Sequence, residues 1–137
     1  MAMFRIFDIA GTGMSAQAVR LNVTASNVAN ADNVSASAET AYRARQPVFT
    51  AFRDFLDGAS PLPGVHVAGI VESDAKVASR YEPDHPLANE EGYVFASNVN
   101  PVEEMVNMLS ASRSYQNNIE VLNTTKELLM RTISLGQ

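Results

Sequence analysis

The sequence contains no cysteine among its 137 residues, which excludes disulfides, thiolate metal sites and a cysteine nucleophile. Uninterrupted apolar runs are only a few residues long, far below the roughly 20 residues that a membrane-spanning helix needs. Cations are scarce as well: ten Lys and Arg stand against 15 Asp and Glu, for a net charge of -5. Nucleic-acid binding requires clustered Lys and Arg to neutralise phosphates. We therefore expect neither a transmembrane segment nor a nucleic-acid partner.

The first residues also lack the features of a secretory signal peptide. Arg5 is followed by Asp8, and no apolar block ends in a small-residue cleavage site. We expect no cleaved signal peptide, so export from the cytoplasm would use another route. With 137 residues, of which 46% are hydrophobic, the chain has the size of one domain and too much apolar character for a disordered segment.

Charge is distributed unevenly along the chain. Residues 1–31 carry +1, residues 101–137 carry -1, and the middle carries five cations against ten acids. This division predicts two weakly charged terminal segments and a solvated middle. We expect three units: an N-terminal helix over 1–31, a connector and β-rich insert over 32–100, and a C-terminal helix over 101–137.

Both terminal segments show the alternating three-and-four spacing of a heptad repeat, which predicts two helices paired as a coiled coil. Asn100, Pro101 and the acids Glu103 and Glu104 form a typical helix start, and Gly136 is placed to end that helix. The N-terminal repeat comprises Phe4, Phe7, Gly11, Met14, Ala18, Leu21, Ala25 and Val28; the C-terminal repeat comprises Met105, Met108, Ser112, Tyr115, Ile119, Leu122, Lys126, Leu129 and Ile133.

Each helix has further apolar residues outside its repeat. A simple hairpin of two helices, each about 45 Å long, would leave these residues in water, and an apolar surface of that size marks an interface. We therefore infer lateral packing against other chains. The residues are Ile6, Ile9, Ala16, Val19 and Val23 in the first helix and Val102, Val106, Leu109, Val121, Leu128 and Leu135 in the second.

Asparagine is frequent in and beside the helical segments, where it is a mediocre helix former. Buried asparagine can fix the register between helices, whereas exposed asparagine has no such role; the sequence leaves both readings open. The residues concerned are Asn22, Asn27, Asn30, Asn107, Asn117, Asn118 and Asn123.

The middle segment has short alternating runs of β-branched and aromatic residues. Residues 42–52 and 65–71 predict a hairpin pair, because a turn-forming stretch with two glycines and two prolines separates them. Residues 76–81 and 92–95 predict two further short strands, and residues 32–41 a mobile connector. The expected fold class is mainly α with a small β-rich insert, in which short β-hairpins lie between the long terminal helices.

Candidate chemistry is sparse. The acidic loop with Glu82, Asp84, His85, Glu90 and Glu91 has metal-ligand residue types without a recognised ligand spacing, and a solvated loop is the simpler interpretation. Neither a nucleophile elbow nor a metalloprotease motif is present. Gly11 and Gly13 lack the preceding strand and third glycine of a dinucleotide loop, so we interpret them as small residues that allow close helix packing. We expect no catalytic residue, metal, cofactor or small-molecule substrate, and no enzyme.

Three stretches resemble the bacterial flagellar basal-body rod proteins, most closely those of the proximal rod. They are RLNVTASNVANADN from Arg20 to Asn33, YEPDHPLANEEGYV from Tyr81 to Val94, and the segment from Asn98 to Gln137. The first and last belong to the wider rod and hook family, whereas the Tyr-Glu-Pro loop and the ending Leu135-Gly136-Gln137 narrow the resemblance to the proximal rod.

The resemblance implies a structural subunit whose terminal helices pair, stack on neighbouring subunits and stay poorly ordered in the free monomer. It implies a drive shaft in the periplasm that transmits torque from the motor ring to the distal rod and hook. The implied partners are other proximal and distal rod subunits, further copies of the same chain, a motor-ring adaptor protein and, in transit, the flagellar type III export apparatus.

By position, the motif from Ser26 to Asn30 would close the first helix and contact neighbouring chains. Glu104 and Arg113 would belong to the corresponding C-terminal motif. The predicted assembly-interface residues are Phe7, Met14, Leu21, Asn27, Val28, Asn30, Met105, Asn107, Met108, Tyr115, Ile119, Leu122, Leu129 and Ile133. Two alternatives remain: a soluble helical adaptor or export chaperone, and a small hydrolase using His85. Residues 53–63 match no motif, so their fold and contacts are open.

Overall fold

A computed structural model describes residues 2–54 and 62–135. The chain begins with the long helix α1 (Ala2–Ala29) and ends with the longer helix α2 (Pro101–Leu135). Five strands lie between them: β1 (Val34–Ser35), β2 (Arg45–Asp54), β3 (Leu62–Glu72), β4 (Ala78–Tyr81) and β5 (Tyr93–Ala96). This confirms the prediction of two terminal helices and an antiparallel β-rich insert.

The predicted start of α2 is confirmed in atomic detail. The Asn100 side-chain oxygen accepts a hydrogen bond from the Val102 N–H at 3.1 Å, while Pro101 occupies the first helical position. Glu103 and Glu104 lie in the first turn, at the positive end of the helix dipole. Gly136, the predicted end of this helix, lies outside the described residues.

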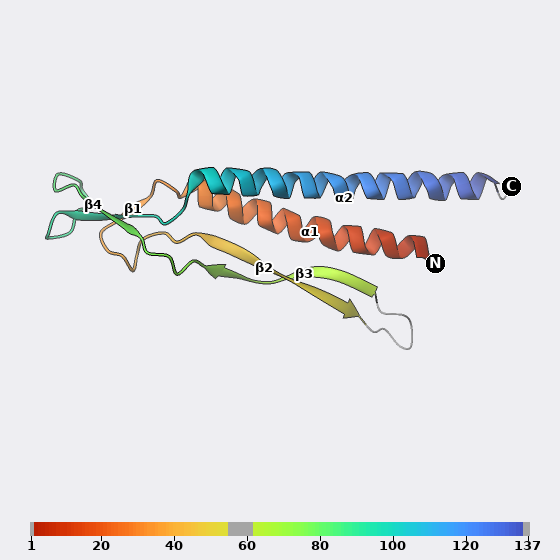
Figure 1. Cartoon of the computed structure of the whole chain (residues 1–137), viewed down its shortest axis with the longest axis horizontal. Coiled ribbons are helices and arrows are strands. Elements are labelled where there is room, and N and C mark those ends of the chain that lie inside the picture. Colours follow the sequence, from red (N-terminus) through yellow and green to blue (C-terminus); the bar gives the residue numbers. More distant parts are fainter. Residues whose placement is uncertain (1, 55–61, 136–137) are drawn as a thin grey trace.

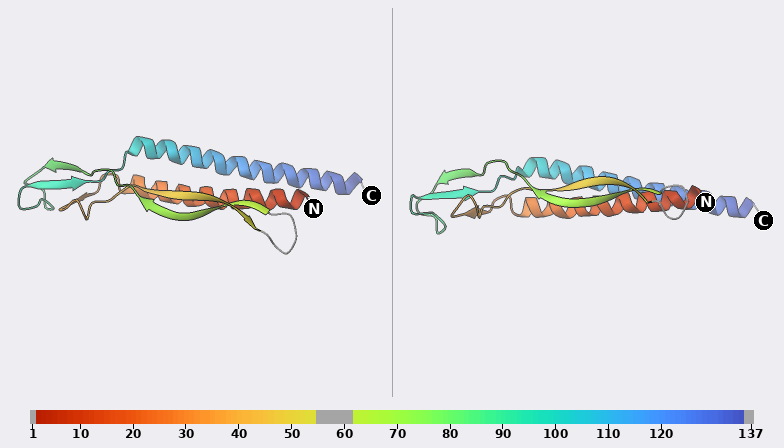
Figure 2. Two further views of the ribbon diagram at one scale, coloured as in Figure 1. Left: turned by 60° about the horizontal axis from the view of Figure 1, so that its bottom comes forward. Right: turned by 90° about the horizontal axis from the view of Figure 1, so that it is seen from below.

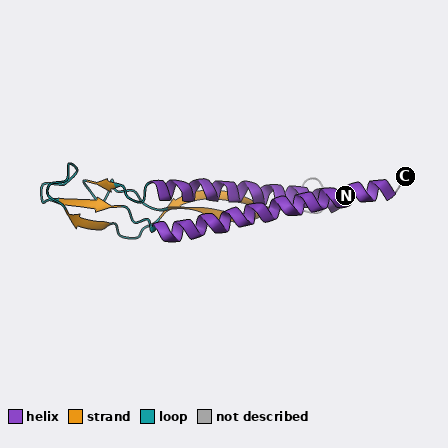
Figure 3. Cartoon of the chain, turned by 90° about the horizontal axis from the view of Figure 1, so that it is seen from above, coloured by secondary structure: helices purple, strands orange, loops and turns teal. Residues whose placement is uncertain are grey.

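The two helices run antiparallel beside each other, and both chain termini lie at the same end of an elongated molecule (Figure 1). Seen from above, the helices cross at a shallow angle, and α2 reaches beyond the beginning of α1 (Figure 3). The small sheet of β1, β4 and β5 lies at the opposite end. Pairing of the helices as a coiled coil stays a prediction.

The hairpin of β2 and β3 folds back along α1 (Figure 2). A two-stranded hairpin is marginally stable alone, so it needs such a support. The Thr12 hydroxyl accepts a hydrogen bond from the Val65 N–H of β3 at 3.3 Å, and Ala16 and Val23 of α1 are buried. The expectation that α1 leaves its whole second apolar stripe in water is therefore wrong for Ala16 and Val23.

The second sheet has the order β1-β5-β4 and is antiparallel throughout. Its central residue Val94 is fully buried, and the rings of Tyr81 and Tyr93 meet edge to face, 5.3 Å between centroids. Gly92 has a φ of 80° just before β5, a conformation that favours glycine. Val34 of β1 pairs with Ala96, so the segment 32–41 contributes a strand and is more than a connector.

The contact line between α1 and α2 differs from the predicted heptad repeats. On α2, the repeat positions Met105, Ile119 and Ile133 are exposed. Glu104, Ala111 and Thr125, each one residue before a repeat position, are buried instead. The other half of the C-terminal repeat lies at least partly inside: Met108, Tyr115, Leu122 and Leu129 are half-buried. The apolar period therefore located both helices correctly. On α2, however, the face that it marks is rotated relative to the face that contacts α1.

Candidate assembly interface

Small and polar side chains form the contact line between the helices. A Cβ added to Gly13 would lie only 3.1 Å from the Asn118 side-chain nitrogen, so the absence of a side chain there allows Asn118 to approach. The Arg20 guanidinium donates to the Asn107 side-chain oxygen at 3.0 Å. One heptad further along α1, Asn27 donates to the Glu104 carboxylate at 3.0 Å. The spacing of Gly13, Arg20 and Asn27 is that of one stripe facing α2.

Asn27 is the junction between this helix pair and the β-rich insert. It is fully buried, and its amide bonds both backbone groups of Arg45, donating to the carbonyl at 2.8 Å and accepting from the N–H at 3.0 Å. Its side-chain oxygen also accepts a hydrogen bond from the Tyr42 hydroxyl at 3.0 Å. With the bond to Glu104, the side chain uses its full hydrogen-bonding capacity and pairs with the first residue of β2 as a neighbouring strand does.

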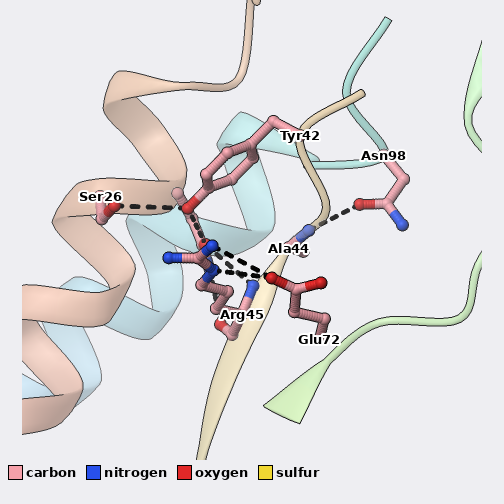
Figure 4. Close-up of polar contacts among 7 residues, drawn as sticks. Ser26, Tyr42, Ala44, Arg45, Glu72 and Asn98 are labelled. Carbon is pink, nitrogen blue, oxygen red and sulfur yellow. Dashed lines mark hydrogen bonds and ion pairs between the residues drawn. The ribbon is translucent and has the colours of Figure 1, made fainter. Parts of the chain in front are cut away.

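Contacts around the junction hold the connector, β2 and β3 together (Figure 4). Tyr42 points its hydroxyl toward Ser26 at 3.3 Å. The Arg45 guanidinium lies 5.6 Å from the centre of the Tyr42 ring and pairs with Glu72 of β3 at 3.0 Å. Because both side chains of that ion pair are about half exposed, its stabilising effect is small. The orientation of the insert therefore depends mainly on the buried amide.

A further asparagine joins the segment before α2 to the connector. Asn98 accepts a hydrogen bond from the Ala44 N–H at 2.7 Å (Figure 4). It also donates to the Ala75 carbonyl at 2.9 Å. The buried Ala44 thus lies between two asparagine side chains, since Asn27 bonds the next residue. The side-chain amides of Asn27 and Asn98 thus hold the chain where it leaves α1 for the sheets and where it returns to α2.

The structure places the predicted interface residues of α1 in three different settings. Phe7, Met14, Leu21 and Val28 are half-buried on a flank of the helix. Asn27 is inside the molecule, so any contribution it makes to assembly is indirect. Asn30 follows the helix end and donates to the Ser26 carbonyl at 2.8 Å, which closes α1 as the family motif implied.

On α2 the predicted interface residues divide between the two sides of the helix. Asn107 contacts Arg20, and the half-buried members of the repeat lie toward α1. Met105, Ile119 and Ile133 are exposed together with other apolar residues. Contact of any of these residues with a neighbouring subunit stays a prediction. The exposed apolar residues of α2 are Val102, Met105, Val106, Leu109, Ile119, Val121, Leu128, Met130, Ile133 and Leu135.

Sequence reasoning named Glu104 only as a helix-start and motif residue and did not name Thr125, so it missed the burial of both side chains. Glu104 is 6% exposed and Thr125 is 5% exposed, so both lie inside although they are polar. Thr125 satisfies its hydroxyl by donating to the Val121 carbonyl at 2.7 Å. The signal for them existed, because Glu104, Ala111, Asn118 and Thr125 repeat at seven residues, but a search for apolar positions does not find it.

Among the described residues, the side chains that could support metal binding or catalysis are not clustered. They contain no group of three or more His, Asp or Glu side chains that could hold a metal ion. His85, the alternative catalytic candidate, accepts a hydrogen bond from the Leu87 N–H at 3.0 Å, which is a turn contact within its own loop. Among the helices of the described ranges, none is sufficiently long and apolar to span a bilayer.

Comparison with known proteins matches both ends of the chain to flagellar families. The family model described as "Flagella basal body rod protein" matches residues 7–36, and the model "Flagellar basal body rod FlgEFG protein C-terminal" matches residues 90–135. Over 137 residues the chain is 53% identical to the flagellar basal-body rod protein FlgC of Salmonella typhimurium. The proteins of the same name from Escherichia coli O157:H7 and Yersinia enterocolitica are 52% and 49% identical. Each of these alignments covers 100% of both chains.

Proposed function

The chain belongs to the family of flagellar basal-body rod proteins, and from this membership we propose that it is a subunit of the proximal rod that assembles through its terminal helices. As a member of that family it is a structural component of the basal body and not a member of an enzyme family. Its finer role is torque transmission from the motor ring to the distal rod and hook, through rigidly packed helices.

One observation carries the proposal: apolar side chains remain exposed on both halves of α2, from Val102 to Leu109 and from Ile119 to Leu135. Val102 is 69% exposed, and Leu135, at the other end of the helix, is 88% exposed. Clusters of exposed apolar side chains mark surfaces that bind another molecule. A rod built from stacked helices covers such surface by adding subunits, and each added interface also makes the shaft stiffer.

The partners and route follow from the same role. Neighbouring rod subunits, proximal and distal, are the direct contacts, together with further copies of this chain and a motor-ring adaptor protein at the base. We propose export through the flagellar type III apparatus without cleavage, and assembly in the periplasm. Membership in a family of flagellar basal-body rod proteins supports this route.

A charge on the exposed face of α2 tests the proposal. We expect Val106→Glu to fold as the natural chain does, because the side chain is 63% exposed, and to abolish swimming in a strain that lacks the natural protein. Circular dichroism of the purified variant, swimming assays and the protein content of isolated basal bodies are the measurements. The matched control is Gln116→Glu, which adds the same charge at an exposed polar position of the same helix.

Normal basal bodies containing Val106→Glu would refute assembly through this face. A chain that supports motility without entering basal bodies would instead favour a soluble adaptor or export chaperone.

A further inference from the structure

One face of α1 remains open after its own chain has packed. The stripe toward α2 contains Gly13, Arg20 and Asn27, and the stripe toward the hairpin contains Thr12 and Ala16. Successive residues turn by about 100° around a helix, so the third side of α1 carries the apolar repeat, of which the first six residues matter here. We call it the open stripe: Phe4, Phe7, Gly11, Met14, Ala18 and Leu21, which are exposed or half-buried.

Gly11 is the unusual member of the open stripe. Glycine destabilises a helix interior relative to alanine, so its presence needs a reason. For Gly13 the reason lies inside the molecule, because Asn118 packs against it. A Cβ added to Gly11, in contrast, meets no atom within 4 Å. The described part of the chain thus gives no reason for glycine at position 11, and a close approach from outside supplies one.

The chain itself presents a surface that fits this stripe. The first turns of α2 carry an apolar ridge of Val102, Met105 and Leu109, which are 69%, 58% and 54% exposed. Its spacing of three and then four residues is the reverse of the spacing from Phe7 to Gly11 to Met14. Antiparallel helices place such patterns opposite each other.

We propose that the α2 ridge of a second copy of this chain packs on the open stripe of α1. In this arrangement, Met105 of one copy sits on Gly11 of the next, Val102 lies against Met14, and Leu109 lies against Phe7. The proposal deepens the proposed function and rests on it, because it assigns two faces of the rod subunit to each other. Charge does not oppose the contact: α1 carries Arg5 and Arg20 against Asp8, and α2 three cations against four acids.

The stagger between copies follows from the register. Within one molecule, Gly13 is opposite Asn118 and Asn27 opposite Glu104, so the α2 residue level with Gly11 is near Glu120. Pairing Gly11 with Met105 instead shifts the second copy by 15 residues, about 22 Å along the axis at 1.5 Å per residue. Since the two faces differ, the contact is heterologous, and such contacts build open-ended arrays unless the rotation closes a ring.

Disulfide trapping tests the contact directly, because the natural chain has no cysteine. A chain with Gly11→Cys and Met105→Cys is expressed in a strain that lacks the natural protein, and isolated basal bodies are oxidised and run without reductant. We expect intermolecular products that extend to a ladder of dimers, trimers and higher species. The control chain carries Gly11→Cys and Gln116→Cys, which lies 11 residues, about 16 Å, further along α2, too far for a disulfide.

A second pair, Phe7→Cys with Leu109→Cys, tests the same register where Gly11→Cys prevents incorporation. Equal yields of product in test and control chains, or products that join the test cysteines only to other rod proteins, would overturn the proposal. Motility and the presence of the control chain in basal bodies are scored in the same cells. If that chain enters basal bodies and supports swimming but neither test pair cross-links, the face assignment fails while the proposed function stands.

Discussion

At the scale of single residues, one buried amide joins the helices to the insert. Asn27 is the only asparagine among the described residues that is fully buried, and it bonds α2, the connector and β2 at once. Neither a carboxylate nor a hydrocarbon can reproduce two donated and two accepted hydrogen bonds. The identity of this side chain therefore fixes how the insert is placed on the helices.

Asn27→Asp tests this role. The variant loses both donors and places a second carboxylate beside Glu104, so we expect the free energy of unfolding to fall by about 3 kcal/mol. Urea denaturation followed by circular dichroism measures the change. Asn22→Asp is the control, because Asn22 is exposed on the same helix, and its effect should stay within about 0.5 kcal/mol. Equal losses in the two variants would contradict the junction.

The two glycines of α1 predict opposite responses to alanine. Gly11→Ala should stabilise the isolated chain by about 0.5–1 kcal/mol, because alanine is the better helix former and the added carbon meets no neighbour. Gly13→Ala should give no gain or a loss, since its Cβ would approach Asn118 to 3.1 Å. Thermal unfolding of both variants compares them. A gain at position 13 equal to that at position 11 would show that Asn118 moves away without cost.

At the scale of elements, α1 serves as the support for the β2–β3 hairpin. The Thr12 hydroxyl bonds the Val65 N–H, and the buried Ala16 lies one turn further along the same side of α1. Val23 lines a cleft together with Ile70 of β3. The strands themselves leave Val48, Phe49, Ile70 and Val71 substantially exposed. The hairpin thus has little apolar cover beyond its contact with α1, and its stability depends on that contact.

Ala16→Glu should release the hairpin without melting the helices. A glutamate at a position that is 3% exposed cannot stay beneath the strands uncompensated. We expect amide hydrogen exchange in β2 and β3 to accelerate by roughly tenfold or more while α2 keeps its protection. Ala25→Glu, on the exposed side of α1, is the control. Unchanged exchange in both variants would mean that the hairpin holds its place without the α1 contact.

At the scale of the whole molecule, the chain is a long and thin body with little interior. Among the described residues, the largest fully buried side chains are Val94 and Asn27, and the buried apolar residues of the helices are mostly alanines. Because so few large apolar side chains are buried, the hydrophobic stabilisation of the single chain is small. The assembly that we propose would supply further apolar burial.

The end of α2 separates folding from assembly. The register of Gly13 with Asn118 places the start of α1 level with about Leu129 of α2. From there α2 continues to Leu135, beyond the start of α1. A chain that stops after Leu129 should therefore keep its thermal stability within about 0.5 kcal/mol but lose incorporation into basal bodies. The control is a chain that stops after Leu135. A truncated chain that unfolds at a much lower temperature would show that the last turns stabilise the monomer.

The sequence by itself determined the elements and their class. The seven-residue period located α1 and α2, the Asn100–Pro101 start placed the first residue of α2, and the alternating β-branched and aromatic runs located β2 and β3. Such signals are local, because capping, turn chemistry and side-chain period act within a few residues. The family motifs at the two ends are equally local and agree with the comparisons.

Only the tertiary structure decided which surface meets which. An apolar stripe shows that burying a helix face is favourable. It does not show whether that face packs against the other helix, a hairpin or a second molecule. Here the α1–α2 contact went to Gly13, Asn27 and Glu104, because small residues permit close approach and a fully satisfied amide tolerates burial. The apolar repeat of α1 lies outside that contact line, on the side where we propose that a second copy packs.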